Sequence, residues 1–453
     1  MKAKKLCIVL VLGLALTLGF ASVRAKPDAA EGLPAELTDT LSWLEHHIEE
    51  HYPEEVDRER LLVGAVQGML SKLDEHSSYM PPEILEVFEA DTKGEFGGLG
   101  IEIKFEPIMK AVLVKQTIPG TPAFRAGLLA GDLIVQIRQG SSEEVIETAD
   151  FEHVFDAVTV LRGEPGTRVT LTVLRGKDRA RKEITITRDV IRVPDVRAAD
   201  LMGPEGKIGY VYIRYFQQRT VQDFQEEMDR LQREGAEGLI MDLRFNPGGL
   251  LEGALEMADL FLDDKLIVSV EGKEGPTQHL RSRPGEAYPH MPIVMLINNY
   301  SASASEIVAA ALAEHGRATL VGSPTHGKAS VQQIFRMEEV GRKDAVKLTI
   351  AHYFTPAGEL ITGKGVQPDI EVEVSEEDLD KLTTNLDRRT SYPRPQDEEP
   401  AADDREEGTE AEEEPFVDPQ LARAVEVMTR ILAEKTGEPH PTPHAAVAPG
   451  TAG

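Results

Sequence analysis

Two apolar segments, each followed by a turn and then by a helical pattern, restrict the fold of this 453-residue chain more than any other feature. Residues 292–297 form a continuous apolar run, and the Ala-rich segment from Glu306 to His315 that follows contains no glycine or proline. The run from Gly238 to Leu243 is followed in the same way by helical periodicity over residues 251–262. Buried strands that alternate with helices are typical of a sheet covered by helices, so the sequence predicts an α/β fold.

A serine stands in the first of these turns, where a strand ends and a helix begins. At such a junction the N–H groups of the helix N-terminus converge on a side-chain oxygen. Ser303 and Glu306 also match a capping box, and a serine that only caps a helix needs no other role. Ser301 and Ser305 are competing candidates for a nucleophile, and the spacing within the run does not separate the three serines.

A lysine follows in a later loop, in the layout of a Ser–Lys dyad. Lys328 lies after the predicted strand 318–322 and is followed by the alternating residues 329–335. A serine hydroxyl attacks a peptide carbonyl only when a base accepts its proton, and a free lysine, with a pKa near ~10.4, is charged at neutral pH. Burial lowers the pKa of a lysine towards roughly 7–8, which would make a buried Lys328 a general base.

A glutamine four residues later is the candidate for orienting this lysine. Gln332 is neutral, so its carbonyl can hold the amine without favouring the charged form as a carboxylate would. On a straight strand the Cα atoms of the two residues would be ~13 Å apart. Contact therefore requires either a bend at Gly327 or a bulge, and the sequence does not decide between them.

The N–H groups that would stabilise an oxyanion come from the two strand–helix junctions. The N–H of Ala304, at the start of the helix, is one candidate. The turn Asn246-Pro247-Gly248-Gly249 supplies the other, because glycines at a helix N-terminus allow a backbone N–H to approach a ligand closely. The same turn is also compatible with a plain connection from strand to helix, and the sequence does not choose between Gly248 and Gly249.

The run Ser-Ala-Ser-Ala-Ser-Glu, with Gly-Lys-x-x-x-Gln downstream, resembles the C-terminal processing peptidases, which are tail-specific serine proteases with a PDZ domain. The resemblance spans roughly residues 50–371. It implies that Ser303 is the nucleophile, Lys328 the general base and Gln332 the residue that orients it, and that a glycine of the Asn-Pro-Gly-Gly turn is the second oxyanion donor. It also implies a crotonase-like β-β-α spiral for the protease core. The sequence departs from the pattern of this family at two positions: His326 stands where the family commonly has an aromatic residue, and Ala329 stands where it commonly has a glycine.

Residues 94–190 form a β-rich module that resembles an inserted PDZ domain. The stretch Gly98-Leu99-Gly100-Ile101 precedes a predicted strand and corresponds to the carboxylate-binding loop. Successive N–H groups in such a loop hold a terminal carboxylate while the peptide adds a strand to the sheet edge. Taken alone, Gly-Leu-Gly is typical of an ordinary turn.

The first 25 residues are typical of a secretory signal. Three lysines precede the apolar segment 6–20, and Val23-Arg24-Ala25 matches a cleavage site. We therefore predict export to the periplasm. The alternative is an uncleaved membrane anchor, although the apolar segment is shorter than the ~20 residues of a spanning helix. Cys7 is the only cysteine, so cleavage would leave a mature chain without a thiol. The residues after the signal, 26–93, are predicted to form a helical region.

The composition changes after residue 371, where the predicted protease core (191–371) ends. Between Glu371 and Gln420 there are 19 acidic and 5 basic residues, and we predict that residues 372–417 are a disordered linker. Residues 418–436 are predicted to form an amphipathic helix that either docks on the core or binds a partner. The tail 437–453 is also predicted to be disordered.

These features predict an exported serine endopeptidase that binds substrate C-termini through its PDZ domain and cuts through a Ser–Lys acyl-enzyme. The alternative is a catalytically silent PDZ scaffold that only binds peptides. Metal-dependent hydrolysis is disfavoured because no ligand cluster is present, and no cofactor is predicted. The net charge of −29 argues against nucleic acid as a partner. The expected partners are proteins or peptides with accessible C-termini, an adaptor protein, and a second copy of the chain bound through the N-terminal helices.

Overall fold

The computed structural model describes residues 35–142, 144–192, 195–198, 201–390 and 416–436, and the chain divides into two compact units, Met1–Met69 and Leu70–Gly453. The first unit holds α1 (Ala35–His51) and all but the last residue of α2 (Arg58–Leu70), both within the predicted helical region. No residue of α1 is buried, and Leu37, Leu41 and Leu44 on its apolar face are 41%, 42% and 47% exposed.

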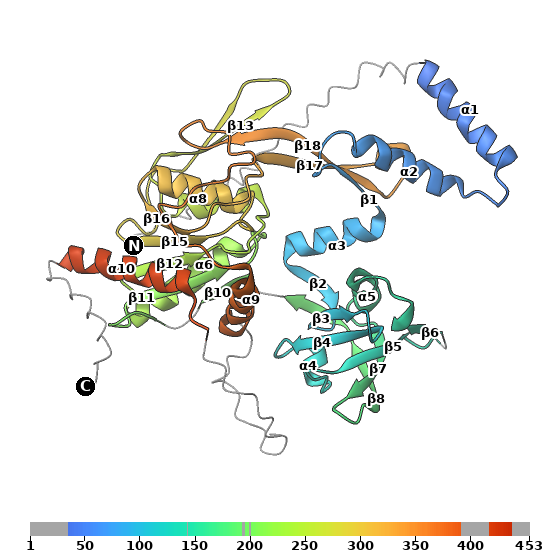
Figure 1. The fold of residues 1–453 in the computed structure, drawn as a ribbon, viewed down its shortest axis with the longest axis horizontal. Helices are drawn as coiled ribbons and strands as arrows, with labels where there is room; N and C mark the ends of the chain where they lie inside the picture. The colour runs from blue at the N-terminus through green and yellow to red at the C-terminus, as the bar shows by residue number, and fades with distance from the viewer. Residues whose placement is uncertain (1–34, 143, 193–194, 199–200, 391–415, 437–453) are drawn as a thin grey trace, which may run out of the picture. The chain divides into compact units, whose positions relative to one another are not determined.

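The larger unit contains a six-stranded sheet in the order β10-β11-β12-β15-β16-β19 (Figure 1). The strands are β10 (Val196–Ala198), β11 (Ile208–Ile213), β12 (Gly238–Asp242), β15 (Ile293–Ile297), β16 (Ala318–Gly322) and β19 (Ile370–Glu371). The pair β10 and β11 is antiparallel, and the other four neighbouring pairs are parallel. The prediction of a mixed α/β fold is confirmed.

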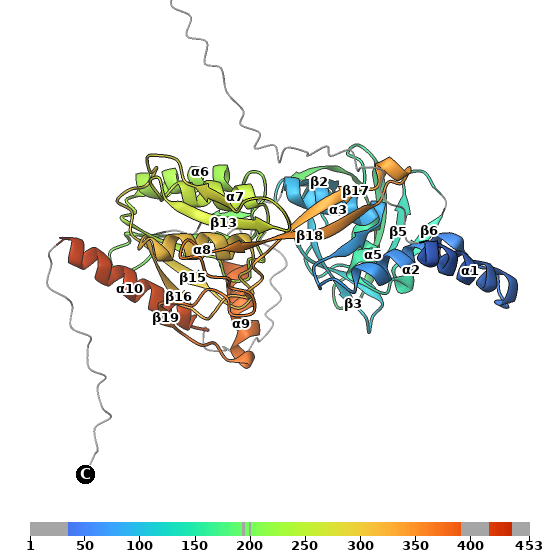
Figure 2. The same ribbon diagram turned by 90° about the horizontal axis from the view of Figure 1, so that it is seen from above.

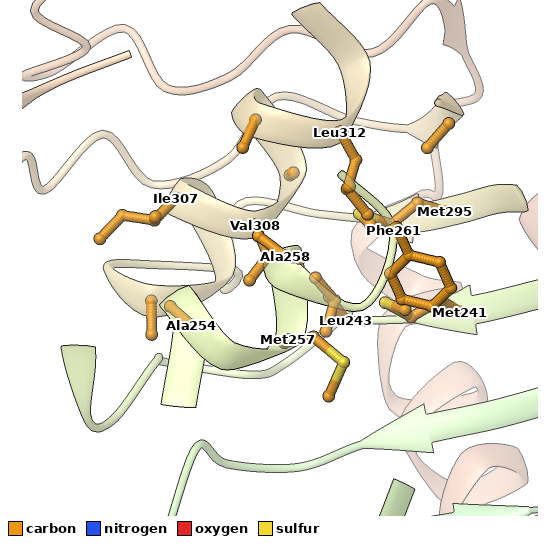
Figure 3. Packing of buried hydrophobic residues seen from close by; sticks show 14 of the residues in the cluster. Met241, Leu243, Ala254, Met257, Ala258, Phe261, Met295, Ile307, Val308 and Leu312 are labelled. Carbon is orange, nitrogen blue, oxygen red and sulfur yellow. The ribbon is translucent and has the colours of Figure 1, made fainter. Parts of the chain in front are cut away.

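Helices cover both faces of this sheet, which explains the unbroken apolar runs of its strands. The covering helices are α6 (Thr220–Glu234), α7 (Leu251–Asp259) and α8 (Ala304–Glu314) on one face and α10 (Pro419–Thr436) on the other (Figures 1 and 2). Met241 and Met295 point to the side of α7 and α8, where they join Met257 and Leu312 (Figure 3). The intervening Ile240 packs with the cluster on the α10 side.

A second, antiparallel sheet holds the segment that follows Lys328. Its order is β1-β18-β13-β14, with β17 also paired to β18, and its strands are β1 (Ser78–Met80), β13 (Leu266–Gly272), β14 (Gln278–Arg281), β17 (Ser330–Arg336) and β18 (Ala345–Phe354). The register of β17 against β18 shifts between Val331 and Gln332. Strand β1 joins the edge of this sheet and leads into α3 (Pro82–Lys93).

The β-rich module has its own sheet and its own core. Its sheet runs β3-β4-β5-β7-β8, with β6 paired to β5, and a separate ribbon joins β2 to β9. The elements are β2 (Glu95–Gly98), β3 (Ile101–Glu106), β4 (Ala111–Thr117), α4 (Pro122–Arg125), β5 (Leu133–Gln139), β6 (Val145–Glu147), α5 (Val154–Leu161), β7 (Arg168–Arg175), β8 (Ala180–Thr187) and β9 (Asp189–Arg192). Val112, Ile134 and Leu171 are fully buried in its core.

The prediction that residues 372–417 are disordered is wrong for their first part. This part contains the helix α9 (Glu376–Thr390), in which Leu382 and Leu386, four residues apart, are buried. The acidic composition concealed this short apolar spacing. The helix α10 docks on the sheet through residues including Leu421 and Met428. Residues 391–415 and 437–453, also predicted to be disordered, lie outside the described part of the chain.

Candidate functional site

Ser303 lies directly between β15 and α8 in a strained backbone conformation. Its φ and ψ are 56° and −114°, a combination that favours glycine over any residue with a side chain. Such strain costs about 1–3 kcal/mol and persists only where the surroundings hold it, which is common at functional sites. The residue is half-buried at the N-terminus of α8.

The hydrogen bonds separate the three candidate serines. The Ser301 hydroxyl donates to Leu243 O at 2.8 Å, and the Ser305 hydroxyl donates to Asn246 O at 3.0 Å. Both of these residues are fully buried. Among the hydrogen bonds of the described residues, none is donated by the hydroxyl of Ser303. Ser303 is therefore the serine whose proton is not already committed to the backbone.

Glu306 links the serine turn to the lysine loop. Its Oε2 atom accepts hydrogen bonds from Ser303 N–H at 2.7 Å and from Lys328 N–H at 3.1 Å. Three more donors bind the same carboxylate: Gly327 N–H, the Thr325 hydroxyl and the Tyr353 hydroxyl, at 2.6, 2.7 and 3.1 Å. The capping box predicts only the contact with Ser303. The side chain is fully buried, so this carboxylate fixes both candidate catalytic residues through their backbones.

Lys328 occupies an environment that disfavours its charged form. Burial lowers the pKa of its amine below the ordinary value, and the positive charge of Lys347 lowers it further. The negative charges of Glu306 and Asp74 act in the opposite direction but do not outweigh burial. The exposed His326, a departure from the family pattern, is not among the charges that shift this pKa. The direction of the shift is the one that a lysine base requires.

The structure contains both the bend and the bulge that could bring Gln332 towards Lys328. Gly327 has a φ of +83°, and the register of β17 shifts immediately before Gln332. Ala329 also has a positive φ, 46°, which is the physical reason why a glycine would suit this position. In the described residues, no hydrogen bond joins the Lys328 amine to Gln332 or to the Ser303 hydroxyl. The backbones of Ser303 and Lys328 are held together by Glu306, whereas no hydrogen bond among the described residues joins the side chains of Ser303, Lys328 and Gln332.

The two glycines of the Asn-Pro-Gly-Gly turn face different neighbours. A Cβ atom on Gly248 would lie 2.7 Å from Ser303 Cβ, whereas one on Gly249 would lie 2.1 Å from Phe216 O. The Gly248 N–H already donates to Asn246 Oδ1 at 2.9 Å. Within the part of the chain that the structure describes, the N–H groups of Ala304 and Gly249 donate to no acceptor. Ala304 directly follows Ser303 in the chain, and Gly249 directly follows Gly248, which lies against Ser303. Both donors are therefore available at the two strand–helix junctions.

A buried ion-pair network supports the base of this turn. Arg244 is fully buried and binds Asp242 at the end of β12, with Nη2 2.6 Å from Oδ2. It also binds Asp418 in front of α10, with Nη2 2.9 Å from Oδ2, and its Nη1 donates to Gln420 at 3.1 Å. This network ties the C-terminal helix to the strand that leads into the Asn-Pro-Gly-Gly turn. The sequence does not predict this network, because no local pattern relates Arg244 to a residue as distant as Asp418.

The predicted carboxylate-binding loop lies at the open edge of the β-rich module. Strand β3 is an edge strand, since it pairs with β4 alone, and α5 packs near it. The carbonyls of Leu99 and Gly100 accept hydrogen bonds from Ala123 and Ile118, both at 2.9 Å. The N–H groups of Leu99 and Gly100 donate to no acceptor in the described residues. The loop therefore presents free donors next to an unpaired strand edge.

The described residues contain no group of three or more histidine, cysteine, aspartate or glutamate side chains that could hold a metal ion. None of the helices in the described ranges is both long enough and apolar enough to cross a membrane.

Family models match two parts of the chain. The model described as "Peptidase family S41" matches residues 207–372, which include both strand–helix junctions and the lysine loop. The model described as "Activating protease CtpB N-terminal domain" matches residues 29–84.

Curated relatives are similar over most of the chain. A carboxy-terminal-processing protease of Bartonella bacilliformis is 41% identical over 324 residues, which cover 70% of each chain. The carboxy-terminal processing protease CtpA of Bacillus subtilis is 33% identical over 372 residues, covering 81% of this chain and 76% of the relative.

Solved structures are similar as well. A photosystem II D1 C-terminal processing protease is 27% identical, covers 73% of this chain and 87% of its own, and gives a TM-score of 0.43. The PDZ domain of a Vibrio cholerae carboxy-terminal protease in complex with a peptide is 28% identical, covers 22% of this chain and 99% of its own, and gives a TM-score of 0.20.

Proposed function

The chain belongs to peptidase family S41 and is a serine-type carboxy-terminal processing protease, and from this premise we propose that Ser303 is its nucleophile and Lys328 its general base. The observation that carries this assignment is the shared contact with Glu306. One carboxylate oxygen accepts hydrogen bonds from the N–H groups of both residues, and the Ser303 hydroxyl, in a strained turn, donates to no acceptor among the described residues.

The proposed reaction is acyl transfer in two steps. The neutral amine of Lys328 accepts the proton of the Ser303 hydroxyl while Oγ forms a bond to the substrate carbonyl carbon. The resulting oxyanion is held by the N–H groups of Ala304 and Gly249, which donate to no acceptor among the described residues. The Lys328 ammonium then gives the proton to the leaving amine, and water hydrolyses the acyl-enzyme with the same lysine as base.

The contact between hydroxyl and amine forms, in this proposal, when substrate is bound. Catalytic hydrogen bonds are often long in a free enzyme and become short only in the complex with substrate. The backbones of both residues are held by Glu306, so the approach requires rearrangement of the lysine side chain. Gln332 then accepts a hydrogen bond from the amine and holds its lone pair towards Ser303.

We propose that the core has the crotonase-like β-β-α spiral that the family resemblance implies. Two consecutive strand–turn–helix units, β12 with α7 and β15 with α8, support this proposal, because each delivers one oxyanion donor at its turn. The parallel pairing of β12 and β15 places the two turns at the same end of the sheet.

We propose that residues 94–190 act as a PDZ domain that binds the C-terminus of a substrate. The free edge of β3 would accept the peptide as an added strand, and the N–H groups of Leu99 and Gly100 would hold its carboxylate. A fluorescent peptide with a free C-terminus should bind the Ser303→Ala protein at least tenfold more tightly than its C-terminal amide. Equal affinities would contradict carboxylate recognition.

Export and self-association complete the proposal. Residues 1–25 would direct the chain to the periplasm, which N-terminal sequencing of the protein from a periplasmic fraction would test.

The exposed apolar face of α1 would be covered by a second copy of the chain or by an adaptor protein. Light scattering before and after Leu41→Glu and Leu44→Glu substitutions distinguishes self-association from a monomer.

Peptide cleavage tests the central assignment. Casein or a peptide with an apolar C-terminus should be cut by the wild type, and Ser303→Ala and Lys328→Ala should each reduce kcat/KM by at least about 10³-fold. A chelator should have no effect. Activity that survives both substitutions would refute the dyad. Peptide binding without any cleavage by the wild type would favour the silent scaffold.

A further inference from the structure

The turn formed by residues 74–77 has no role in the reaction so far, yet it lies against the strands beside Lys328. The Asp74 carboxylate accepts hydrogen bonds from the N–H groups of His76 and Ser77, both at 2.8 Å, and from the Ser77 hydroxyl at 2.8 Å. Ser77 Oγ accepts the N–H of Thr349 on β18 at 3.1 Å. Burial lowers the pKa of the His76 imidazole, and the positive charge of Lys328 lowers it further.

A chain of hydrogen bonds runs from this turn to Gln332. The Thr349 hydroxyl donates to Asp74 Oδ1 at 3.2 Å, and Gln332 Nε2 donates to Thr349 Oγ1 at 3.4 Å. Burial would raise the pKa of Asp74, but the hydrogen bonds from Ser77, His76 and Thr349 hold it below its ordinary value. Asp74 is therefore ionised at neutral pH and can only accept.

The single proton of Thr349 sets the direction of this chain. Because that proton is donated to Asp74, Thr349 Oγ1 can only accept from Gln332, and the group that faces it must be the amide NH₂. Ser330 Oγ is 2.9 Å from the same nitrogen, but this hydroxyl has no other partner among the described residues and can rotate to donate or accept. Thr349 alone thus distinguishes the two orientations of the Gln332 amide.

We propose that Asp74 and Thr349 are positioning residues for the general base, which turn the carbonyl oxygen of Gln332 away from β18 and towards the Lys328 amine. The proposal rests on the assignment of Lys328 as the base and Gln332 as its orienting group. In the opposite orientation the amide NH₂ would donate to the lone pair of the neutral amine. That lone pair could then not accept the Ser303 proton.

A pair of substitutions at Thr349 tests the relay in the full-length protein. Thr349→Val removes the hydroxyl with little change in shape, and should lower kcat/KM roughly 10- to 100-fold. It should also move the acidic limb of the pH profile of kcat/KM to lower pH, because an amide N–H facing the amine disfavours the ammonium form. Thr349→Ser keeps the hydroxyl and should restore the wild-type profile. A purely structural role would lower the rate without moving the limb.

A double-mutant cycle separates the relay from its premise. In a Gln332→Ala background Thr349→Val should cause no further loss, because the relay acts only through Gln332. Thr349→Ala also removes the hydroxyl but leaves the charge of Asp74, which itself raises the pKa of Lys328, in place. It should shift the acidic limb in the same direction as Thr349→Val, which provides a second route if the valine variant does not fold by circular dichroism. An unshifted limb in both variants, or fully additive losses, would overturn the relay. Full activity of Lys328→Ala would instead overturn the proposed base.

Discussion

Replacement of Glu306 by glutamine tests whether one buried carboxylate holds both catalytic backbones. The Oε2 atom accepts from two backbone N–H groups and the Tyr353 hydroxyl, and Oε1 accepts from Gly327 N–H at 2.6 Å and the Thr325 hydroxyl at 2.7 Å. A glutamine of the same size offers one acceptor oxygen and one NH₂ group. Whichever way its amide is turned, the NH₂ group faces at least one backbone N–H that cannot rotate away.

The expected cost follows from these contacts. The less costly orientation turns the NH₂ group towards Thr325 and Gly327, because the threonine hydroxyl can rotate and only one N–H loses its acceptor. An unsatisfied buried donor costs about 1–3 kcal/mol, and the remaining hydrogen bonds lose their charge assistance, which is worth roughly 1 kcal/mol or more. We therefore expect Glu306→Gln to lower the free energy of unfolding by roughly 3–5 kcal/mol.

Urea unfolding followed by circular dichroism, in a Ser303→Ala background that cannot cut itself, measures this cost. The matched control is Glu314→Gln on the same helix, an exposed carboxylate that accepts the N–H of Ala357 at 2.6 Å. It should change the free energy of unfolding by less than about 1 kcal/mol. If Glu306→Gln cost no more than this control, the carboxylate would not hold the site together.

The same substitution predicts the direction of a pH effect in the protein that remains folded. The charge of Glu306 raises the pKa of Lys328, so its removal should lower that pKa further. The acidic limb of the kcat/KM profile should accordingly move to lower pH, and a shift to higher pH would contradict the reasoning.

Three more predictions concern strain, linkage and the C-terminal helix. Ser303→Gly should be inactive but more stable than Ser303→Ala by about 1–2 kcal/mol in urea titrations, because glycine adopts the φ of 56° without strain; equal stabilities would contradict the strain. The pKa of Lys328 is lowered in the folded state, so the unfolded chain binds more protons between the two pKa values and stability rises with pH there. Lys328→Met, made in the Ser303→Ala background, should therefore be more stable than the Ser303→Ala parent at neutral pH. The difference in their free energies of unfolding should shrink as the pH approaches 10.5. Asp418→Ala leaves the buried Arg244 with one carboxylate and should lower the free energy of unfolding by about 3–5 kcal/mol in the same assay. The control Glu426→Ala, which breaks the exposed pair with Arg423, should lower it by less than about 1 kcal/mol.

Local sequence patterns determined the elements of this protein. The apolar runs at 238–242 and 293–297 became the central strands, and the segments after them became α7 and α8, because burial on both faces requires unbroken apolar residues. The pairing of a serine at a helix start with a later lysine and glutamine was visible from residue types and spacing. The acidic composition of residues 372–417 misled the prediction, since two buried leucines four residues apart were enough for α9.

Contacts between distant residues were decided only by the tertiary structure. Residue types left three serines and two glycines as candidates, and the hydrogen bonds committed Ser301, Ser305 and the Gly248 N–H to other partners. The second contact of Glu306, with Lys328, joins two loops whose approach depends on how β15 and β16 pair. Periodicity reports which face of an element is apolar, but it carries no information about which polar atoms of different elements meet. Hydrogen bonds act over about 3 Å, so which of them form depends on how the sheets pack in three dimensions.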